Sequence, residues 1–229
     1  EHFRFIRIDL PYFGLSKKNN NLELSEDYYN TFLDQLINHL NLKKVNLLGH
    51  SLGAFIAWKY AIHRPERVEK LILLAPPGYP QAAPKVISLS TTPLIKQLAL
   101  LWTPKFILPP ILNNLFFDNS NISQDMINRY YNMMMCEGNR KQYADIFSFM
   151  IKHAGKEHLD MNQLNLPVLI LWGKKDLWVP SRKAAPYFKE KLPHAKIVLY
   201  EKMRHMPQYE ETVNTLNQLF LFFDLPVVT

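Results

Sequence analysis

The chain has 229 residues, of which 48% are hydrophobic, and this size and composition suit one compact globular domain with a sizeable core. No stretch approaches the roughly 18 consecutive apolar residues that a membrane-spanning helix needs, and the single cysteine, Cys136, excludes an internal disulfide. The net charge of +7 comes from basic residues that occur mostly in ones and twos. We interpret it as a solvated surface and expect no nucleic-acid partner.

The chain opens on an alternating segment, Phe3 to Asp9, that predicts a β-strand. It starts with Glu1 rather than Met, and it shows no signal-peptide pattern. Because a domain rarely begins in mid-sheet, we expect a fragment or a processed form. A secretory or membrane-anchoring segment ahead of Glu1 stays open, so the sequence assigns neither a compartment nor an oligomeric state.

Helical and extended patterns alternate along the rest of the chain. Ser25 is a typical N-cap with acidic residues in the next turn, and apolar residues from Tyr29 to Leu40 recur at spacings of three and four. Apolar runs predict buried strands at 45–48, 71–74, 168–172 and 197–200, with a helix at 54–62. Such strands, separated by helices, predict the α/β class, with a mostly parallel sheet covered on both faces.

One interval is too long for an ordinary crossover. About ninety residues separate the second and third of these strands, whereas connecting loops usually take 2–6 residues. The interval contains a helix-type pattern beginning at Ser123 and a first half rich in Pro, Leu and aromatic residues. We therefore expect an α/β core from residues 1–75 and 162–229, and a mainly helical insertion, a cap, over 76–161.

The strongest motif is Gly49-His50-Ser51-Leu52-Gly53, which matches G-x-S-x-G between a predicted strand and a predicted helix. A serine at so sharp a turn projects from the strand's C-terminal end, and glycines on both sides allow the close approach. The helix N-terminus behind it favours developing negative charge. Ser51 is the candidate nucleophile, the N–H of Leu52 is a candidate oxyanion-hole donor, and His50 is expected to pack rather than to catalyse.

A serine nucleophile needs a base, and the base needs an orienting acid. Asp176 follows the strand at 168–172 and a glycine turn, while His205 lies on the loop after the last strand. Taken singly, the aspartate could close a turn and the histidine could be a surface residue. Together they follow Ser51 in the order Ser, Asp, His at the C-terminal ends of parallel strands, where open α/β sheets place their sites.

Several segments resemble the α/β-hydrolase superfamily, in its lipase- and esterase-like branch with a helical cap. They are the strand-loop segment Ile8 to Ser16, which is similar to D-L-P-G-F-G-x-S, then 64–68, 172–176 with Val179-Pro180, and 205–207 with Glu210. In the cap, 128–131 and 137–140 resemble lipase-like members. The haloalkane dehalogenases and epoxide hydrolases use an aspartate nucleophile, whereas position 51 is serine.

The chain departs from the family pattern at three places. Tyr12 and Arg204 stand where the family usually has glycine. We expect this chain to lack the family's earlier strands and its His-Gly loop, which supplies a second oxyanion donor. Loss of one such donor costs about 10²–10³ in rate.

The sequence thus predicts a serine hydrolase that cleaves a small-molecule ester with an apolar acyl or alcohol group through an acyl-enzyme. Thioester, amide or C–C bond hydrolysis with the same triad stays open, as does a non-catalytic ligand-binding or truncated member. We expect no cofactor and no metal, because His153 and His158 lack a ligand set. A membrane or lipid interface is left open.

Overall fold

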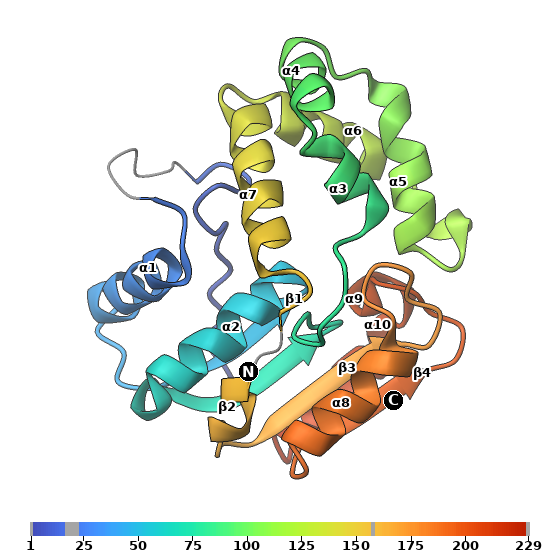
Figure 1. Cartoon of the computed structure of the whole chain (residues 1–229). Helices are drawn as coiled ribbons and strands as arrows, with labels where there is room; N and C mark the ends of the chain where they lie inside the picture. Colours follow the sequence, from blue (N-terminus) through green and yellow to red (C-terminus); the bar gives the residue numbers. More distant parts are fainter. Residues whose placement is uncertain (1, 17–22, 157–158, 228–229) are drawn as a thin grey trace.

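A computed structural model describes residues 2–16, 23–156 and 159–227 of the chain. Its centre is a parallel sheet with the order β1-β2-β3-β4, and all three neighbouring pairs run parallel (Figure 1). The strands are β1 Val45–His50, β2 Val68–Leu74, β3 Val168–Gly173 and β4 Lys196–Tyr200. Helices lie on both sides of this sheet, which confirms the predicted α/β class.

Helices lie before, between and after the strands, and several lie in a row between β2 and β3. They are α1 Glu26–His39, α2 Leu52–His63, α3 Lys85–Ser90, α4 Pro93–Leu101, α5 Leu108–Leu115, α6 Gln124–Met135, α7 Asn139–His153, α8 Ser181–Lys191, α9 Pro207–Glu210 and α10 Thr212–Phe222. Short 3-10 turns occupy η1 Pro65–Arg67, η2 Lys105–Ile107, η3 Asn119–Asn121 and η4 Leu159–Gln163. None of the helices within the described residues combines the length and the apolar character needed to cross a bilayer.

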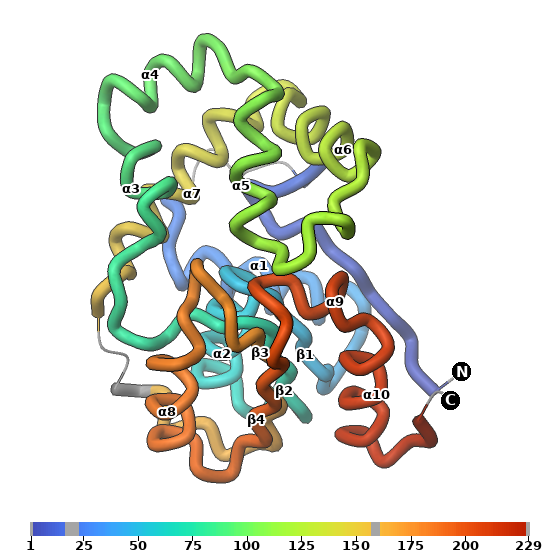
Figure 2. The backbone as a smooth tube through the Cα atoms, turned by 90° about the vertical axis from the view of Figure 1, so that its right-hand side faces the viewer, coloured from blue at the N-terminus to red at the C-terminus, as the bar shows by residue number. Residues whose placement is uncertain are grey.

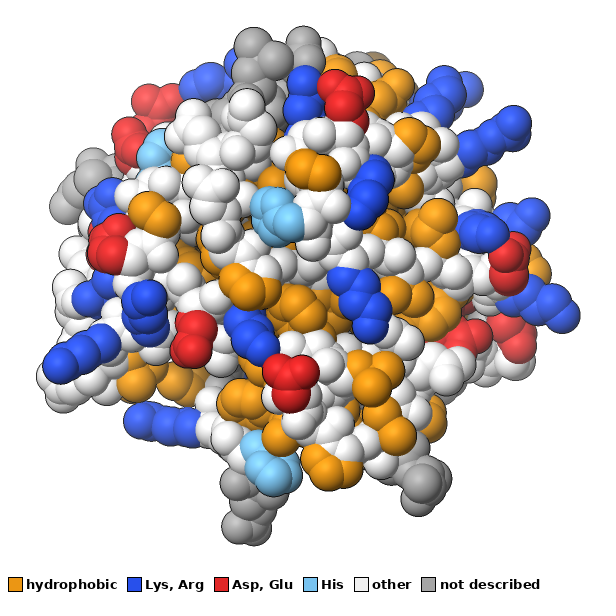
Figure 3. Space-filling view, turned by 90° about the horizontal axis from the view of Figure 1, so that it is seen from below, with side chains coloured by type: hydrophobic (Ala, Val, Ile, Leu, Met, Phe, Trp, Pro, Cys, Tyr) orange, Lys and Arg blue, Asp and Glu red, His pale blue; other side chains and the backbone are white. Residues whose placement is uncertain are grey.

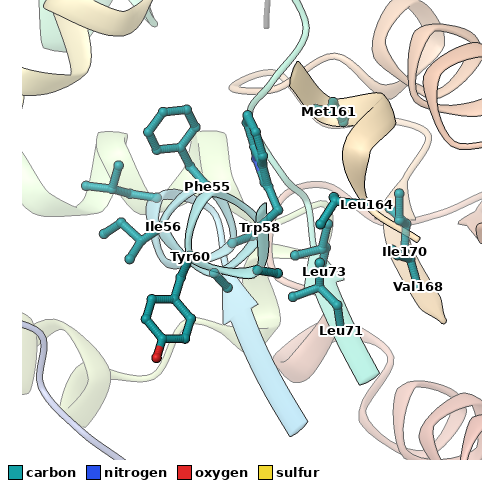
Figure 4. Close-up of a cluster of buried hydrophobic side chains, with 14 of the residues drawn as sticks. Phe55, Ile56, Trp58, Tyr60, Leu71, Leu73, Met161, Leu164, Val168 and Ile170 are labelled. Carbon is teal, nitrogen blue, oxygen red and sulfur yellow. The ribbon is translucent and has the colours of Figure 1, made fainter. Parts of the chain in front are cut away.

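Alternation along the strands divides the core into two clusters. Leu71 and Leu73 of β2 pack against α2 in the larger cluster, which Figure 4 shows around Trp58. Ile72 and Leu74 point to the opposite face, where they join the residues of α10. Because the side chains of residues 71–74 and of β3 all have a covered face to enter, these segments are continuous apolar runs in the sequence.

The helix predicted after Ser25 forms as α1. The Ser25 hydroxyl accepts a hydrogen bond from the amide of Tyr28 at 3.1 Å, which satisfies one of the unpaired N–H groups of the first turn. Tyr29, Leu33 and Ile37 are buried at the predicted spacing and belong to the larger cluster.

The interval between β2 and β3 contains α3 to α7. In Figures 1 and 2 these helices form a layer above one end of the sheet, with α4 outermost. We call this layer, from α3 to α7 (residues 85–153), the cap. The helix predicted from Ser123 forms as α6, and the Ser123 hydroxyl accepts the Met126 amide at 3.1 Å. On the face seen from below in Figure 3, away from the cap, basic side chains alternate with acidic and apolar ones.

Two expectations about the first half of the sheet are wrong. Residues 3–9 form no strand and are exposed, because none of the described strands pairs with their backbone. The strand at 45–48 forms but is not fully buried. It is the last strand in the order on its side, and Leu48 is 52% exposed because no described element covers it.

Candidate active site

Ser51 occupies a strained turn between β1 and α2. Its φ is +52°, a value that residues with a side chain rarely adopt, and its amide donates to the carbonyl of Leu74 on β2 at 2.9 Å. The neighbouring strand therefore holds the turn, and the serine lies at the C-terminal end of the sheet, as the G-x-S-x-G motif requires.

The two motif glycines have different roles. A Cβ atom at Gly49 would lie 2.3 Å from the carbonyl oxygen of Gly53, so only glycine fits at position 49. A Cβ atom at Gly53 would meet nothing within 4 Å outside its own helix. The expected close approach is therefore present at Gly49, and the steric reason given for Gly53 is wrong.

Asp176 lies in a turn just after β3, where its carboxylate accepts hydrogen bonds on both oxygens. Oδ1 accepts the backbone amides of Trp178 at 2.8 Å and Val179 at 2.9 Å, and Oδ2 accepts Nε1–H of Trp172 at 3.1 Å. The carboxylate is fully buried. Since buried charges are costly unless they are hydrogen-bonded, this set of donors explains how an ionised aspartate is kept inside the protein.

His205 connects this carboxylate to the serine. Its Nδ1 lies 2.7 Å from Oδ2 of Asp176, and its Nε2 lies 2.9 Å from Oγ of Ser51. A carboxylate only accepts hydrogen bonds, so Nδ1 carries the proton, and Nε2 of the neutral ring is free to accept the serine proton. The structure thus brings together the three residues that the sequence singled out.

His50 lies between the turn and the His205 loop. Its Nε2 is 2.7 Å from the carbonyl oxygen of His205, and the two rings lie 4.9 Å apart. Burial, together with the nearby His205 ring, lowers the pKa of His50 to about 3. The ring is therefore neutral at physiological pH and donates Nε2–H to the carbonyl, so it supports the position of His205, in line with the expected packing role.

A close backbone approach joins the Asp176 turn to the His205 loop. A Cβ atom at Gly173 would lie 2.1 Å from the carbonyl oxygen of Arg204 and 2.3 Å from that of Met203. The amide of Lys175 donates to the Met203 carbonyl at 3.0 Å. The missing side chain at Gly173 therefore lets the base and its orienting acid lie within hydrogen-bond distance.

Arg204 attaches the His205 loop to the cap. Its guanidinium donates to the carbonyl of Phe116 at 3.0 Å and also to that of Asn113, both at the C-terminal end of α5. The next amide, that of His205, donates to the Leu115 carbonyl at 2.9 Å. Sequence reasoning marked Arg204 as a departure from glycine but missed this anchoring role, because its acceptors are backbone atoms some ninety positions earlier in the chain.

Glu210 supports the same loop from α9. One carboxylate oxygen accepts the Arg204 amide at 3.0 Å, and the other accepts the Phe117 amide. Burial raises the pKa of Glu210, and its backbone hydrogen bonds only partly offset this effect. The sequence grouped Glu210 with the histidine motif, and the structure shows the contact behind that grouping.

The amide of Leu52 is the first N–H of α2. It donates to no acceptor within the described residues. An unpaired N–H at a helix N-terminus next to the nucleophile suits a developing oxyanion.

A cavity of about 610 Å³, counting the part open to solvent, begins at Ser51. One wall is the chain at 77–84, between β2 and α3, and the other is the last turn of α7 with Phe149 and Met150. Most of the lining is apolar. The ring of Trp178, which also lines the cavity, stacks on that of His205 with the ring centroids 6.0 Å apart. A lining of this kind suits an apolar group placed next to the serine.

In the described part of the chain, no group of three His, Cys, Asp or Glu residues is placed to hold a metal ion. His153 lines the cavity, and its Nδ1 pairs with Glu26 of α1 at 3.2 Å. His158, the other histidine considered for a metal, lies outside the described residues.

Comparisons with known sequences agree with this geometry. The profile of the alpha/beta hydrolase fold family matches residues 1–212. An uncharacterized hydrolase of Bacillus subtilis (strain 168), YugF, is 29% identical to this chain. The alignment covers 79% of this chain and 66% of the length of YugF. A 2-hydroxy-6-oxononadienedioate/2-hydroxy-6-oxononatrienedioate hydrolase of Klebsiella pneumoniae is 26% identical over 96% of this chain and 76% of its own length.

Solved structures share the fold. A variant of the meta-cleavage product hydrolase CumD superposes with a TM-score of 0.81 at 19% identity, covering 94% of this chain and 78% of CumD. A putative lipase from Acinetobacter baumannii gives 0.76 at 24% identity, covering 93% and 72%. Because the family profile matches residues 1–212 and the sheet is parallel, the chain belongs to the alpha/beta hydrolase fold family.

Proposed function

We propose that the chain is a serine hydrolase that cleaves carboxylic esters with an apolar acyl or alcohol group. The observation that carries this proposal is the continuous line of contacts from Asp176 through His205 to Ser51, at 2.7 and 2.9 Å. A serine becomes nucleophilic at neutral pH when such a base accepts its proton.

In the proposed reaction, Oγ of Ser51 attacks the ester carbonyl as its proton passes to Nε2 of His205. The Leu52 amide stabilises the oxyanion, and Asp176 stabilises the imidazolium. The tetrahedral intermediate then collapses as His205 returns the proton to the leaving alcohol. Water repeats the sequence on the acyl-enzyme, releasing the acid and restoring the serine hydroxyl.

The apolar cavity supports an apolar substrate group. Phe55, Phe149 and Met150 line it close to Ser51, and each methylene buried there contributes about 0.8 kcal/mol of binding. A longer acyl chain that fits the cavity therefore gains about fourfold per methylene in kcat/KM, until the cavity is filled.

Hydrolysis of a C–C bond is the second candidate, because relatives over 96% of the chain are named as hydrolases of 2-hydroxy-6-oxo dienedioates. That reaction could use the same serine and histidine. A direct comparison decides between the two: p-nitrophenyl esters from acetyl to dodecanoyl on one side, and a 2-hydroxy-6-oxo dienoate on the other. Ester turnover that rises with acyl length and disappears in Ser51→Ala supports the proposal. Turnover of the dienoate alone contradicts it.

A further inference from the structure

The outermost part of the cap exposes large apolar side chains. They lie on α3, on α4 and in the turn that follows α4, and each is more than half exposed. We call this set the cap-tip surface: Leu89, Leu94, Leu98, Leu101, Trp102 and Phe106.

The stripe is regular along α4. Leu94, Leu98 and Leu101 follow at spacings of four and three, so they share one helix face, and that face points to solvent. Trp102 comes next, and its ring packs against that of Phe106 with centroids 6.3 Å apart. No residue of α4 is buried. An amphipathic helix usually turns its apolar side to the core, and an exposed apolar surface this concentrated marks an interaction site.

The chain segment that carries the cap-tip surface has basic residues and no acidic ones. From residue 76 to Phe117 it contains three lysines and no aspartate or glutamate. Two of them, Lys85 and Lys105, are exposed, one before and one after α4 in the chain, and the ammonium group of Lys105 also donates to Oδ1 of Asn128 on α6. Lys96, on α4 itself, is half-buried. The face seen from below, at the other end of the molecule, mixes both signs (Figure 3).

We propose that the cap-tip surface binds the interface of an anionic phospholipid bilayer, with α4 lying in the plane of the membrane. Exposed leucines with an adjoining tryptophan and phenylalanine suit the boundary between headgroups and acyl chains, and lysines beside them suit anionic headgroups. A second copy of the chain fits less well, because pairing two such surfaces would bring like charges together.

The position of the surface is consistent with this partner. In Figures 1 and 2 α4 lies at the tip of the molecule farthest from the sheet, where a flat bilayer can reach it. The wall of the cavity at 77–84 continues directly into α3, so the bilayer would lie beside the cavity that starts at Ser51.

Co-sedimentation with vesicles tests the proposal without requiring turnover, so its failure is distinct from failure of the proposed reaction. The chain and its Ser51→Ala variant are mixed with phosphatidylcholine vesicles, with and without about one third phosphatidylglycerol. Both proteins are expected to bind the anionic vesicles at least tenfold more tightly, because each lysine near such a surface strengthens binding about fivefold.

Two double variants separate the apolar and the charged contributions. Leu101→Asp with Phe106→Asp should weaken binding to anionic vesicles at least tenfold. Lys85→Glu with Lys105→Glu should abolish the preference for anionic over neutral vesicles. The control is Val213→Asp, which places a carboxylate on an apolar residue of α10 that is 60% exposed, away from the cap, and should bind like the parent.

Three results would overturn the proposal. The parent could fail to bind either vesicle, or Val213→Asp could weaken binding as much as the cap variants do. Alternatively, the parent could sediment as a dimer that Leu101→Asp dissociates, which would assign the surface to a second copy.

Discussion

Replacing Asp176 with asparagine tests the hydrogen-bond arrangement at the base of the site. Two backbone amides point at Oδ1, so the asparagine oxygen must take that position and its NH₂ group must take the position of Oδ2. The NH₂ then donates to Nδ1 of His205, which leaves the proton on Nε2. Nε2 can no longer accept the proton of Ser51.

For Asp176→Asn, the expected loss of transition-state stabilisation is larger than the expected loss of folding stability. A triad histidine held in the wrong tautomer loses about 10⁴ in kcat, equal to about 5 kcal/mol of transition-state stabilisation. The NH₂ group also faces the Trp172 indole N–H, and a donor facing a donor in a buried site costs about 1–3 kcal/mol of stability. That N–H keeps the Val179 carbonyl as a second acceptor at 3.0 Å, so the lower end of this range is expected.

The assay compares p-nitrophenyl ester hydrolysis and urea unfolding for the parent, Asp176→Asn and Glu201→Gln. The last is the control, because Glu201 is an exposed carboxylate close to the His205 loop. Asp176→Asn should stay folded and lose about 10⁴ in kcat, while Glu201→Gln should match the parent. A folded Asp176→Asn protein with more than about a tenth of the parent rate would refute the reasoning about the tautomer.

Three further predictions follow from individual contacts. Gly173→Ala should displace the His205 loop, lowering kcat at least about tenfold and stability by about 1–3 kcal/mol; unchanged kinetics would contradict the close contact. The pKa of His50 is about 3 in the folded protein and about 6.5 in the unfolded chain. The neutral ring therefore makes its full contribution to the free energy of unfolding above about pH 6.5. Between about pH 6.5 and about pH 3 this contribution falls by about 1.4 kcal/mol per pH unit. Urea unfolding should therefore show a shallower acid decline for His50→Gln, and equal slopes would count against the neutral ring. Burial alone would raise the pKa of Glu26, but the hydrogen bond from His153 and the charge of Lys59 lower this pKa below its usual value. The ionised carboxylate therefore stabilises the fold above the pKa that Glu26 has in the unfolded chain. This stabilisation is lost as the pH falls through the pKa of Glu26 in the folded protein. Glu26→Gln should lose less stability on acidification than the parent, and the pairing is refuted if it loses as much.

Patterns along the chain were enough to predict the central sheet and the candidate triad. Residues 71–74 and β3 are apolar runs because the centre of the sheet is covered on both faces, and the residues after the parallel strands meet at one edge. Ser51, Asp176 and His205 were recognisable because each follows a strand at that edge. The expected division at residues 75 and 161 stays a prediction, although α3 to α7 all fall between those positions.

The contacts that position the triad could not be predicted in the same way. Arg204 binds carbonyls at the end of α5, and Gly173 makes room for a backbone segment thirty positions later. Both contacts depend on how the cap and the loops fold together, and backbone carbonyls leave no residue-specific signal in a sequence. The alternation at residues 3–9 predicted a strand, but a strand also requires a hydrogen-bonded neighbour, which periodicity cannot show.

Labelling with a fluorophosphonate probe tests the central claim most directly, because only an activated serine reacts quickly. The parent, Ser51→Ala and His205→Ala are each treated with the probe, and the adduct is measured by intact mass, with circular dichroism to confirm folding. The account predicts one adduct on the parent, located at Ser51, and none on either variant. A folded parent that stays unlabelled, or a His205→Ala protein that labels as fast as the parent, would contradict an assembled Ser51–His205–Asp176 triad.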